Sequence, residues 1–129
     1  MTDKLNTGIE LSLEATVKKA DTARSFGSGL LDVYATPAMI TFMERTSMEL
    51  VQDYLPEAYG TVGIHVEVNH IKASSVGARV VCRAKLVNIS DRKLSFEVAV
   101  SERGETVGSG VHDRFIINEK KFIEKLNQQ

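Results

Sequence analysis

The stretch TPAMITFMERTSMELVQDY, residues 36–54, decides the fold because it predicts the one long helix of the chain. Thr36 is a good helix N-cap, and Pro37 at the first helical position gives up an N–H group that would have had no partner. The helix is expected to end near Tyr54, because Pro56 disfavours helical geometry in the residue before it. Apolar residues recur at helical spacing and form a stripe that faces a core. The stripe consists of Met39, Ile40, Met43, Ser47, Leu50, Val51 and Tyr54.

Alternation of apolar and polar residues predicts five strands, one before this helix and four after it. In the first, residues 10–18, the alternation is strict, which is typical of a half-buried strand. The later strands are joined by short turns, and Asn118 is placed to cap a short C-terminal helix. We expect these four strands over residues 61–70, 78–89, 94–102 and 105–117.

The strand over residues 61–70, TVGIHVEVNH, carries a histidine at its end. The period of two places His70 on the apolar face of this strand and His65 on the opposite face. The residues expected to share the face with His70 are Val62, Ile64, Val66 and Val68.

The order of strand, long helix and four strands predicts a single domain over residues 1–129 of the α+β class. Its arrangement is the hotdog fold, in which a curled antiparallel sheet wraps one long central helix, here with a short C-terminal helix. Such a sheet leaves an edge strand exposed, and pairing of edges across a two-fold axis is a usual remedy. We therefore expect a homodimer.

The composition excludes some classes of partner. Lys and Arg number 16 and Asp and Glu number 17, so no long-range field attracts a polyanion such as nucleic acid. The N-terminus MTDKLNTGIELSLE lacks a basic region followed by an apolar stretch, and no run of 18 apolar residues occurs. We expect a cytoplasmic protein that does not enter a membrane. Cys82, the only cysteine, stands in the strand pattern VVCRA and is expected in the core rather than as a nucleophile.

Three residues are candidates for chemistry, and each has a structural alternative. A hydroxyl at Thr36 can cap the helix backbone, or it can face a thioester whose developing oxyanion suits the N–H groups of a helix N-terminus. Glu44, two turns later, lies beside the apolar stripe, where it can serve as an acid or base or extend to the surface. His70 can act as a base or can hydrogen-bond a backbone carbonyl.

A metal centre is not expected. His65 and His112 have no spacing to the other candidate ligands that suggests a zinc site, and no HExxH, CxxC, GxSxG or phosphate-binding glycine loop occurs. Neither a metal nor a redox cofactor is therefore required.

The stretches VYATPAMITFMERTS, residues 33–47, and GTVGIHVEVNHIKAS, residues 60–74, resemble the fluoroacetyl-CoA thioesterase-like branch of the hotdog superfamily. In that branch a Thr in an A-T-P helix start, a Glu eight residues later and a His 26 residues beyond the Glu form the catalytic constellation. The resemblance implies that Thr36, Glu44 and His70 are catalytic. It also implies that Gly63 and Arg114, the latter in a His-x-Arg-Phe pattern, belong to the substrate site.

The loop before the A-T-P motif departs from the enzyme that names the branch, which closes its pocket there with phenylalanines. Residues 25–36 read SFGSGLLDVYAT, so Leu30 and Leu31 stand where an aromatic lid would be and Phe26 comes earlier. We expect Leu30 and Phe26 to contact substrate from a lid over residues 20–33. The resemblance supports the reaction class and not selectivity for a fluorinated acyl group.

The function expected from the sequence is hydrolysis of a small acyl-CoA to a carboxylic acid and CoA, by water attack or through an acyl-Thr intermediate. The candidate cations for binding the CoA phosphates are Lys72, Arg79 and Arg114. The alternatives are a hotdog hydratase that acts on enoyl thioesters and a non-catalytic module that binds acyl-CoA.

Overall fold

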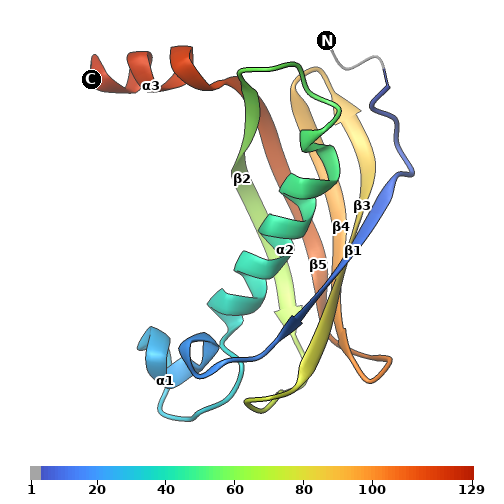
Figure 1. Cartoon of the computed structure of the whole chain (residues 1–129), viewed down its shortest axis with the longest axis vertical. Coiled ribbons are helices and arrows are strands. Elements are labelled where there is room, and N and C mark those ends of the chain that lie inside the picture. The colour runs from blue at the N-terminus through green and yellow to red at the C-terminus, as the bar shows by residue number, and fades with distance from the viewer. Residues whose placement is uncertain (1–3) are drawn as a thin grey trace.

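The computed structural model describes residues 4–129, which form a five-stranded antiparallel sheet and one long helix (Figure 1). The strand order in the sheet is β1-β3-β4-β5-β2, so β1 and β2 are its edges. The elements in chain order are β1 (Glu10–Thr16), the 3₁₀ turn η1 (Lys19–Asp21), α1 (Ala23–Phe26), α2 (Thr36–Gln52), β2 (Tyr59–His70), β3 (Arg79–Ser90), β4 (Lys93–Glu102), β5 (Glu105–Asn118) and α3 (Glu119–Asn127).

Helix α2 runs along one face of the sheet and packs against all five strands (Figure 1). Most of its predicted apolar stripe is buried, with Met39, Met43 and Val51 fully so, whereas Ile40 and Tyr54 are half-buried. Phe42 and Thr46 widen the buried face. On the sheet side the core is formed by alternate residues of β3 and β4, including Cys82, whose predicted place in the core is confirmed. Burial of this one face of α2 is what fixes the helix in the curl of the sheet.

The start of α2 differs from the prediction. Ala35 is the N-cap residue, with an extended backbone, and Thr36 is the first helical residue, whose side chain makes no capping hydrogen bond. The reason lies in the preceding chain: Tyr34 donates its N–H to Ser74 O and Ala35 donates to Asp21 O, which holds both residues extended up to the helix. The Thr36 hydroxyl is thereby left available for another partner.

A β-bulge in β2 overturns part of the predicted strand pattern. The pairing of β2 with β5 changes register between Gly63 and His65, so Ile64 has no cross-strand partner. Because directly opposed residues share a face, Gly63 lies with buried Arg114, whereas Val62 lies with exposed Phe115. The prediction is wrong for Val62 and Ile64. After the bulge Val66, Val68 and His70 lie on the inner face, as predicted.

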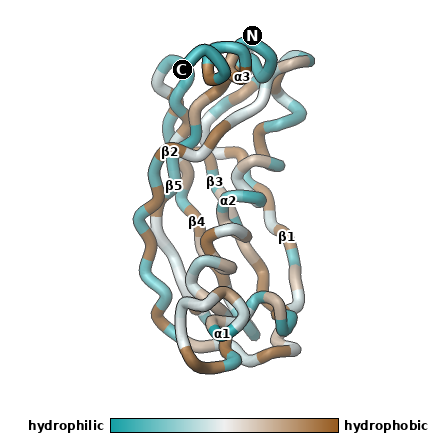
Figure 2. The backbone as a smooth tube through the Cα atoms, turned by 90° about the vertical axis from the view of Figure 1, so that its left-hand side faces the viewer, coloured by the Kyte–Doolittle hydropathy of each residue, from teal (hydrophilic) through white to brown (hydrophobic). Residues whose placement is uncertain are grey.

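The segment between β1 and α2 folds at the end of the molecule where α2 begins, as Figure 1 shows. It contains η1 and α1, so the segment expected to form a lid over residues 20–33 includes a short helix. The Arg24 guanidinium ties it together, because it pairs with Asp32 at 3.1 Å and donates to Leu30 O at 2.9 Å. The connection after α1 is hydrophobic where it passes this end of the molecule (Figure 2).

Helix α3 projects from the sheet at the opposite end of α2 (Figure 1). Asn118 caps it as predicted, since its Oδ1 accepts the N–H of Lys121 at 3.0 Å. No residue of α3 is buried. Within residues 4–129 no helix combines the length and the apolar character needed to span a membrane.

Candidate active site

Thr36 and His70 meet at the start of α2, although 34 residues separate them in the chain. The Thr36 Oγ1 atom lies 2.8 Å from His70 Nδ1, which is hydrogen-bond distance. The pair stands in an open hollow of about 380 Å³, whose walls also include Tyr34, Lys72 and Ala73. Both side chains are accessible to solvent, and the hydroxyl is hydrogen-bonded to the imidazole. In this arrangement an imidazole can activate a hydroxyl oxygen as a nucleophile.

Burial lowers the pKa of His70 from the ordinary value of 6.5, and the nearby Lys72 backbone opposes this shift more weakly. His70 is therefore neutral near pH 7. A neutral ring whose Nδ1 accepts the Thr36 hydroxyl carries its proton on Nε2, and this atom is buried without a hydrogen-bond partner among the described residues. The ring is thus ready to take a proton at Nδ1.

Tyr34 forms the wall behind His70 and was not found from the sequence. The two rings meet edge to face, with centroids 6.0 Å apart and planes at 82°. Burial, and after it the charge of Asp21, raises the pKa of the Tyr34 phenol, so it stays protonated. The position of Tyr34 directly before the A-T-P motif was the only sequence signal for it.

Glu44 lies in a second group of residues, at the middle of α2. Its Oε2 atom is 3.9 Å from Arg114 Nη1 on β5, and its side chain is 43% exposed, which agrees with the predicted partial burial. Gly63 makes the room: a Cβ atom built on this residue would lie 2.8 Å from Glu44 Oε2. The glycine and the arginine were both predicted for the substrate site, and the structure brings them together around this carboxylate.

Arg114 is held from the β2 side. Its Nε donates to Thr61 Oγ1 at 2.7 Å and its Nη2 donates to Thr61 O at 3.0 Å. Its Nη1 lies 3.2 Å from His112 Nε2. Thr61 was missed from the sequence because the predicted alternation gave the inner face to Val62, whereas the bulge at Ile64 gives it to Thr61, which is paired with buried Ile116.

The two groups lie apart within one chain. Eight residues of helix correspond to about 12 Å of axial rise, so Glu44 is remote from Thr36 along α2. The structure therefore pairs Thr36 with His70, and Glu44 with Arg114 and Gly63, rather than joining all three predicted catalytic residues.

The predicted lid residues do not line the hollow that holds Thr36 and His70. Leu30 is 85% exposed and Phe26 is 48% exposed, and the loop reaches that hollow through Ala23, Ser28 and Val33 instead. Within this chain Leu30 and Phe26 therefore project outward from the loop at the rim.

The three cations considered for the CoA phosphates are already engaged. Lys72 pairs with Glu105, Arg79 pairs with Glu14 at 2.7 Å, and Arg114 is buried. None of the three stands as an unpaired cation at the mouth of the hollow.

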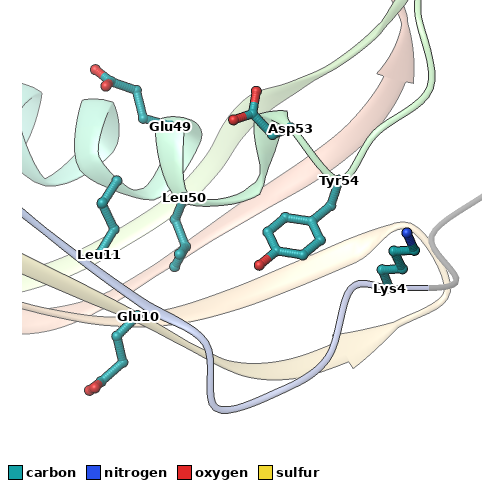
Figure 3. Close-up of a pocket in the computed structure, with 7 residues that line it drawn as sticks. All are labelled: Lys4, Glu10, Leu11, Glu49, Leu50, Asp53 and Tyr54. Atoms are coloured by element: carbon teal, nitrogen blue, oxygen red, sulfur yellow. The ribbon is translucent and has the colours of Figure 1, made fainter.

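A larger hollow, of about 610 Å³, lies at the far end of α2 (Figure 3). Leu50 and Tyr54 extend from α2 and the turn after it toward β1, while the Glu49 and Asp53 carboxylates lie on the helix side. Its lining contains no nucleophile beside a base, so it does not compete with the hollow at Thr36 as a reaction site. Residues 4–129 also hold no group of three or more His, Cys, Asp or Glu side chains that could bind a metal ion.

A curled antiparallel sheet wrapped around one long helix defines the hotdog fold. The α+β hotdog prediction is thus confirmed. A hot-dog-like protein of Thermanaerovibrio acidaminovorans shares this fold at a TM-score of 0.88 and 17% identity, covering 96% of this chain and 92% of its own.

Residues 17–120 match the family described as fluoroacetyl-CoA-specific thioesterase, and the chain belongs to this family. The fluoroacetyl-CoA thioesterase of Streptantibioticus cattleyicolor is 32% identical over 98 residues, which cover 76% of this chain and 70% of that protein. A solved structure of a fluoroacetyl-CoA thioesterase superimposes at a TM-score of 0.93, with 27% identity and 98% of both chains covered. The resemblance drawn from the sequence is confirmed.

Proposed function

We propose that this protein is an acyl-CoA thioesterase that hydrolyses a small acyl-CoA to a carboxylic acid and free CoA. The observation that carries the proposal is the Thr36–His70 hydrogen bond of 2.8 Å at the open N-terminus of α2. The family supports it, since a 27% identical fluoroacetyl-CoA-specific thioesterase variant was solved in complex with fluoroacetate and CoA, at a TM-score of 0.85 with 92% of this chain and 99% of that chain covered.

The reaction begins at Thr36. Its Oγ1 attacks the thioester carbonyl carbon while the hydroxyl proton passes to His70 Nδ1. Negative charge on the carbonyl oxygen is stabilised by first-turn N–H groups of α2, which have no helical partners. The C–S bond then breaks, and the CoA thiolate takes the proton from His70. Water, whose proton passes to His70, then attacks the acyl-Thr36 ester. The ester C–O bond breaks, Thr36 Oγ1 takes the proton back from His70, and the acid is released.

The third residue, Glu44, reaches this centre from a second copy of the chain. β2 is a 12-residue edge strand whose outer edge is unpaired in the described chain, and Ile64 and Val66 on it are 52% and 39% exposed. A long apolar edge of this kind calls for a partner strand. For an antiparallel pairing of two β2 strands we place the two-fold axis between Val66 and Glu67, because this register sets Gly63, with Glu44 beside it, opposite the partner subunit's His70. The homodimer is therefore part of the proposal.

A mixing experiment tests this shared site. Thr36→Ala and Glu44→Gln homodimers are each expected to be inactive. After subunit exchange, half of the dimers carry one variant chain of each kind, and one of their two sites is intact, so about a quarter of wild-type activity returns. A mixture that stays inactive, with exchange verified by native mass spectrometry, contradicts the shared site.

The thioesterase proposal is tested by free-thiol release from a panel of acetyl-, propionyl-, isobutyryl-, benzoyl- and fluoroacetyl-CoA. We expect thiol release with at least one small acyl group. A panel without thiol release, or loss of the double bond of crotonyl-CoA with no thiol formed, contradicts hydrolysis, and the second outcome indicates a hydratase.

A further inference from the structure

His112, on β5, connects a backbone carbonyl of β2 to Arg114. Its ring is buried, with 1% of the residue exposed. Nδ1 lies 2.8 Å from the carbonyl oxygen of His65, and Nε2 lies 3.2 Å from Arg114 Nη1. A carbonyl oxygen only accepts a hydrogen bond and a guanidinium only donates one. The two contacts therefore determine which ring nitrogen of His112 carries the proton. The proton is on Nδ1, and Nε2 offers its lone pair to Arg114.

The contact between His112 and the His65 carbonyl lies at the β-bulge of β2. The register changes between Gly63 and His65, and the His65 carbonyl meets His112 next to the glycine that makes room for Glu44. The His112 Cε1 atom lies 3.3 Å from a Cβ atom built on Gly63, so the imidazole belongs to the same small space as the carboxylate. The Phe96 ring, opposite His112 on β4, stacks on the imidazole with centroids 6.2 Å apart and planes at 27°.

We propose that His112 is a positioning residue for thioester hydrolysis: by accepting a hydrogen bond from Arg114 Nη1, it aims that guanidinium at the Glu44 carboxylate. This inference rests on the proposed thioesterase function and on the role given there to Glu44. Thr61 holds the other two nitrogens of Arg114, so His112 supplies the contact that fixes the remaining one. His112 itself touches no reacting atom.

Protonation of His112 breaks this connection, because an N–H at Nε2 would face a donor. The charged groups around the ring have opposite effects on the pKa of His112: Arg114 lowers it, whereas Glu44 and Asp113 raise it. Burial is the largest influence and lowers the pKa of His112 from 6.5. The neutral ring thus persists in mildly acidic solution.

The tautomer is measured by long-range ¹H–¹⁵N correlation on the histidine rings of the full-length protein. We expect His112 to be the neutral Nδ1–H form at pH 7, with an Arg114 N–H signal protected from exchange. Replacement by His112→Phe is expected to remove that protection while keeping the fold. An Nε2–H tautomer, a charged ring at pH 7, or unchanged Arg114 protection overturns the inference, and none of these results depends on enzymatic activity.

Kinetics give the second test. His112→Phe is expected to lower kcat about 10- to 100-fold, because the Glu44 carboxylate is no longer held in its catalytic orientation. KM is expected to change little, because the substrate pocket is unchanged. Val111→Ala, an exposed neighbour on β5, is the control and keeps wild-type rates. The double variant with Arg114→Gln is expected to be no slower than Arg114→Gln alone.

The outcomes separate the two proposals. If wild type releases thiol and His112→Phe retains its kcat, the inference on His112 fails while the thioesterase function stands. If the effects of His112→Phe and Arg114→Gln multiply, His112 does not act through Arg114. If wild type releases no thiol, the proposed function fails, and the exchange measurement alone decides whether His112 orients Arg114.

Discussion

The two halves of the candidate site are built differently. Thr36 and His70 stand at the open end of α2 and share a single hydrogen bond. Glu44 is surrounded at mid-helix by buried Arg114 and by Gly63, on strands whose hydrogen bonds fix every nitrogen of that arginine. The reacting pair is thus joined by one contact between two side chains, whereas the position of the carboxylate depends on the sheet and its bulge.

The largest effect is expected at the reacting pair. His70→Ala should reduce thiol release about 10²- to 10⁴-fold, because it removes the base that receives the Thr36 proton. Since the two groups act as one unit, the double variant with Thr36→Ala should be hardly slower than either single variant. The rates of the three variants are compared under single-turnover conditions, and multiplicative losses would show that the residues act independently.

An intermediate effect is expected at Gly63. The Cβ atom of Gly63→Ala would approach Glu44 Oε2 to 2.8 Å, and the end of that flexible side chain moves aside. We expect kcat to fall about 10- to 100-fold, with the melting temperature nearly unchanged. Gly60→Ala on the same strand is the control, because the nearest atom to its Cβ, on Glu119, is 3.5 Å away. Equal kinetics for the two alanine variants would argue against a constrained carboxylate.

Acid should weaken the fold through the carboxylate region. Burial lowers the pKa of His112 in the folded protein, while in the unfolded chain it titrates near 6.5. Below that pH the unfolded chain binds more protons, so the free energy of unfolding falls as the pH falls. Urea unfolding at pH 7.5, 6.5 and 5.5 measures the slope, and His112→Phe should flatten it. An unchanged slope in this variant would assign the pH dependence to other groups.

The smallest effect is expected at the rim. Leu30 is 85% exposed, so Leu30→Ala should change the free energy of unfolding by less than about 0.5 kcal/mol. A role in acyl-group contact would appear as a change in KM for bulky acyl-CoAs only. If the melting temperature drops by several degrees, the loop is packed in a way that its exposure does not indicate.

Much of the fold was predictable because it follows from local patterns. The stripe of α2 and the alternation in β3 and β4 each give a buried face, the alternation in β1 gives a half-buried one, and the A-T-P motif marks the helix start to within one residue. The long helix before four strands then leaves few arrangements other than a helix covered by a sheet.

The rest depends on contacts that a pattern does not contain. A single unpaired residue, Ile64, shifts the phase of β2 and moves Val62 to the outer face, and nothing in the run TVGIHVEV marks it except Gly63. Likewise, the spacing of Thr36, Glu44 and His70 does not tell which of them meet within one chain. Which of them meet depends on how the end of β2 packs beside the start of α2. The resulting Thr36–His70 contact joins residues 34 positions apart in the chain.

The most direct measurement is thiol release from acetyl-CoA by wild type, Thr36→Ser, Thr36→Ala and Thr41→Ala at equal protein concentration. Thr41 lies in the same helix, is exposed, and bonds only the Pro37 carbonyl, so it is a matched control. We predict that wild type and Thr41→Ala release thiol at equal rates, that Thr36→Ser retains activity, and that Thr36→Ala loses about 100-fold or more. Thiol release by Thr36→Ala at the wild-type rate would contradict the central role of the Thr36–His70 pair.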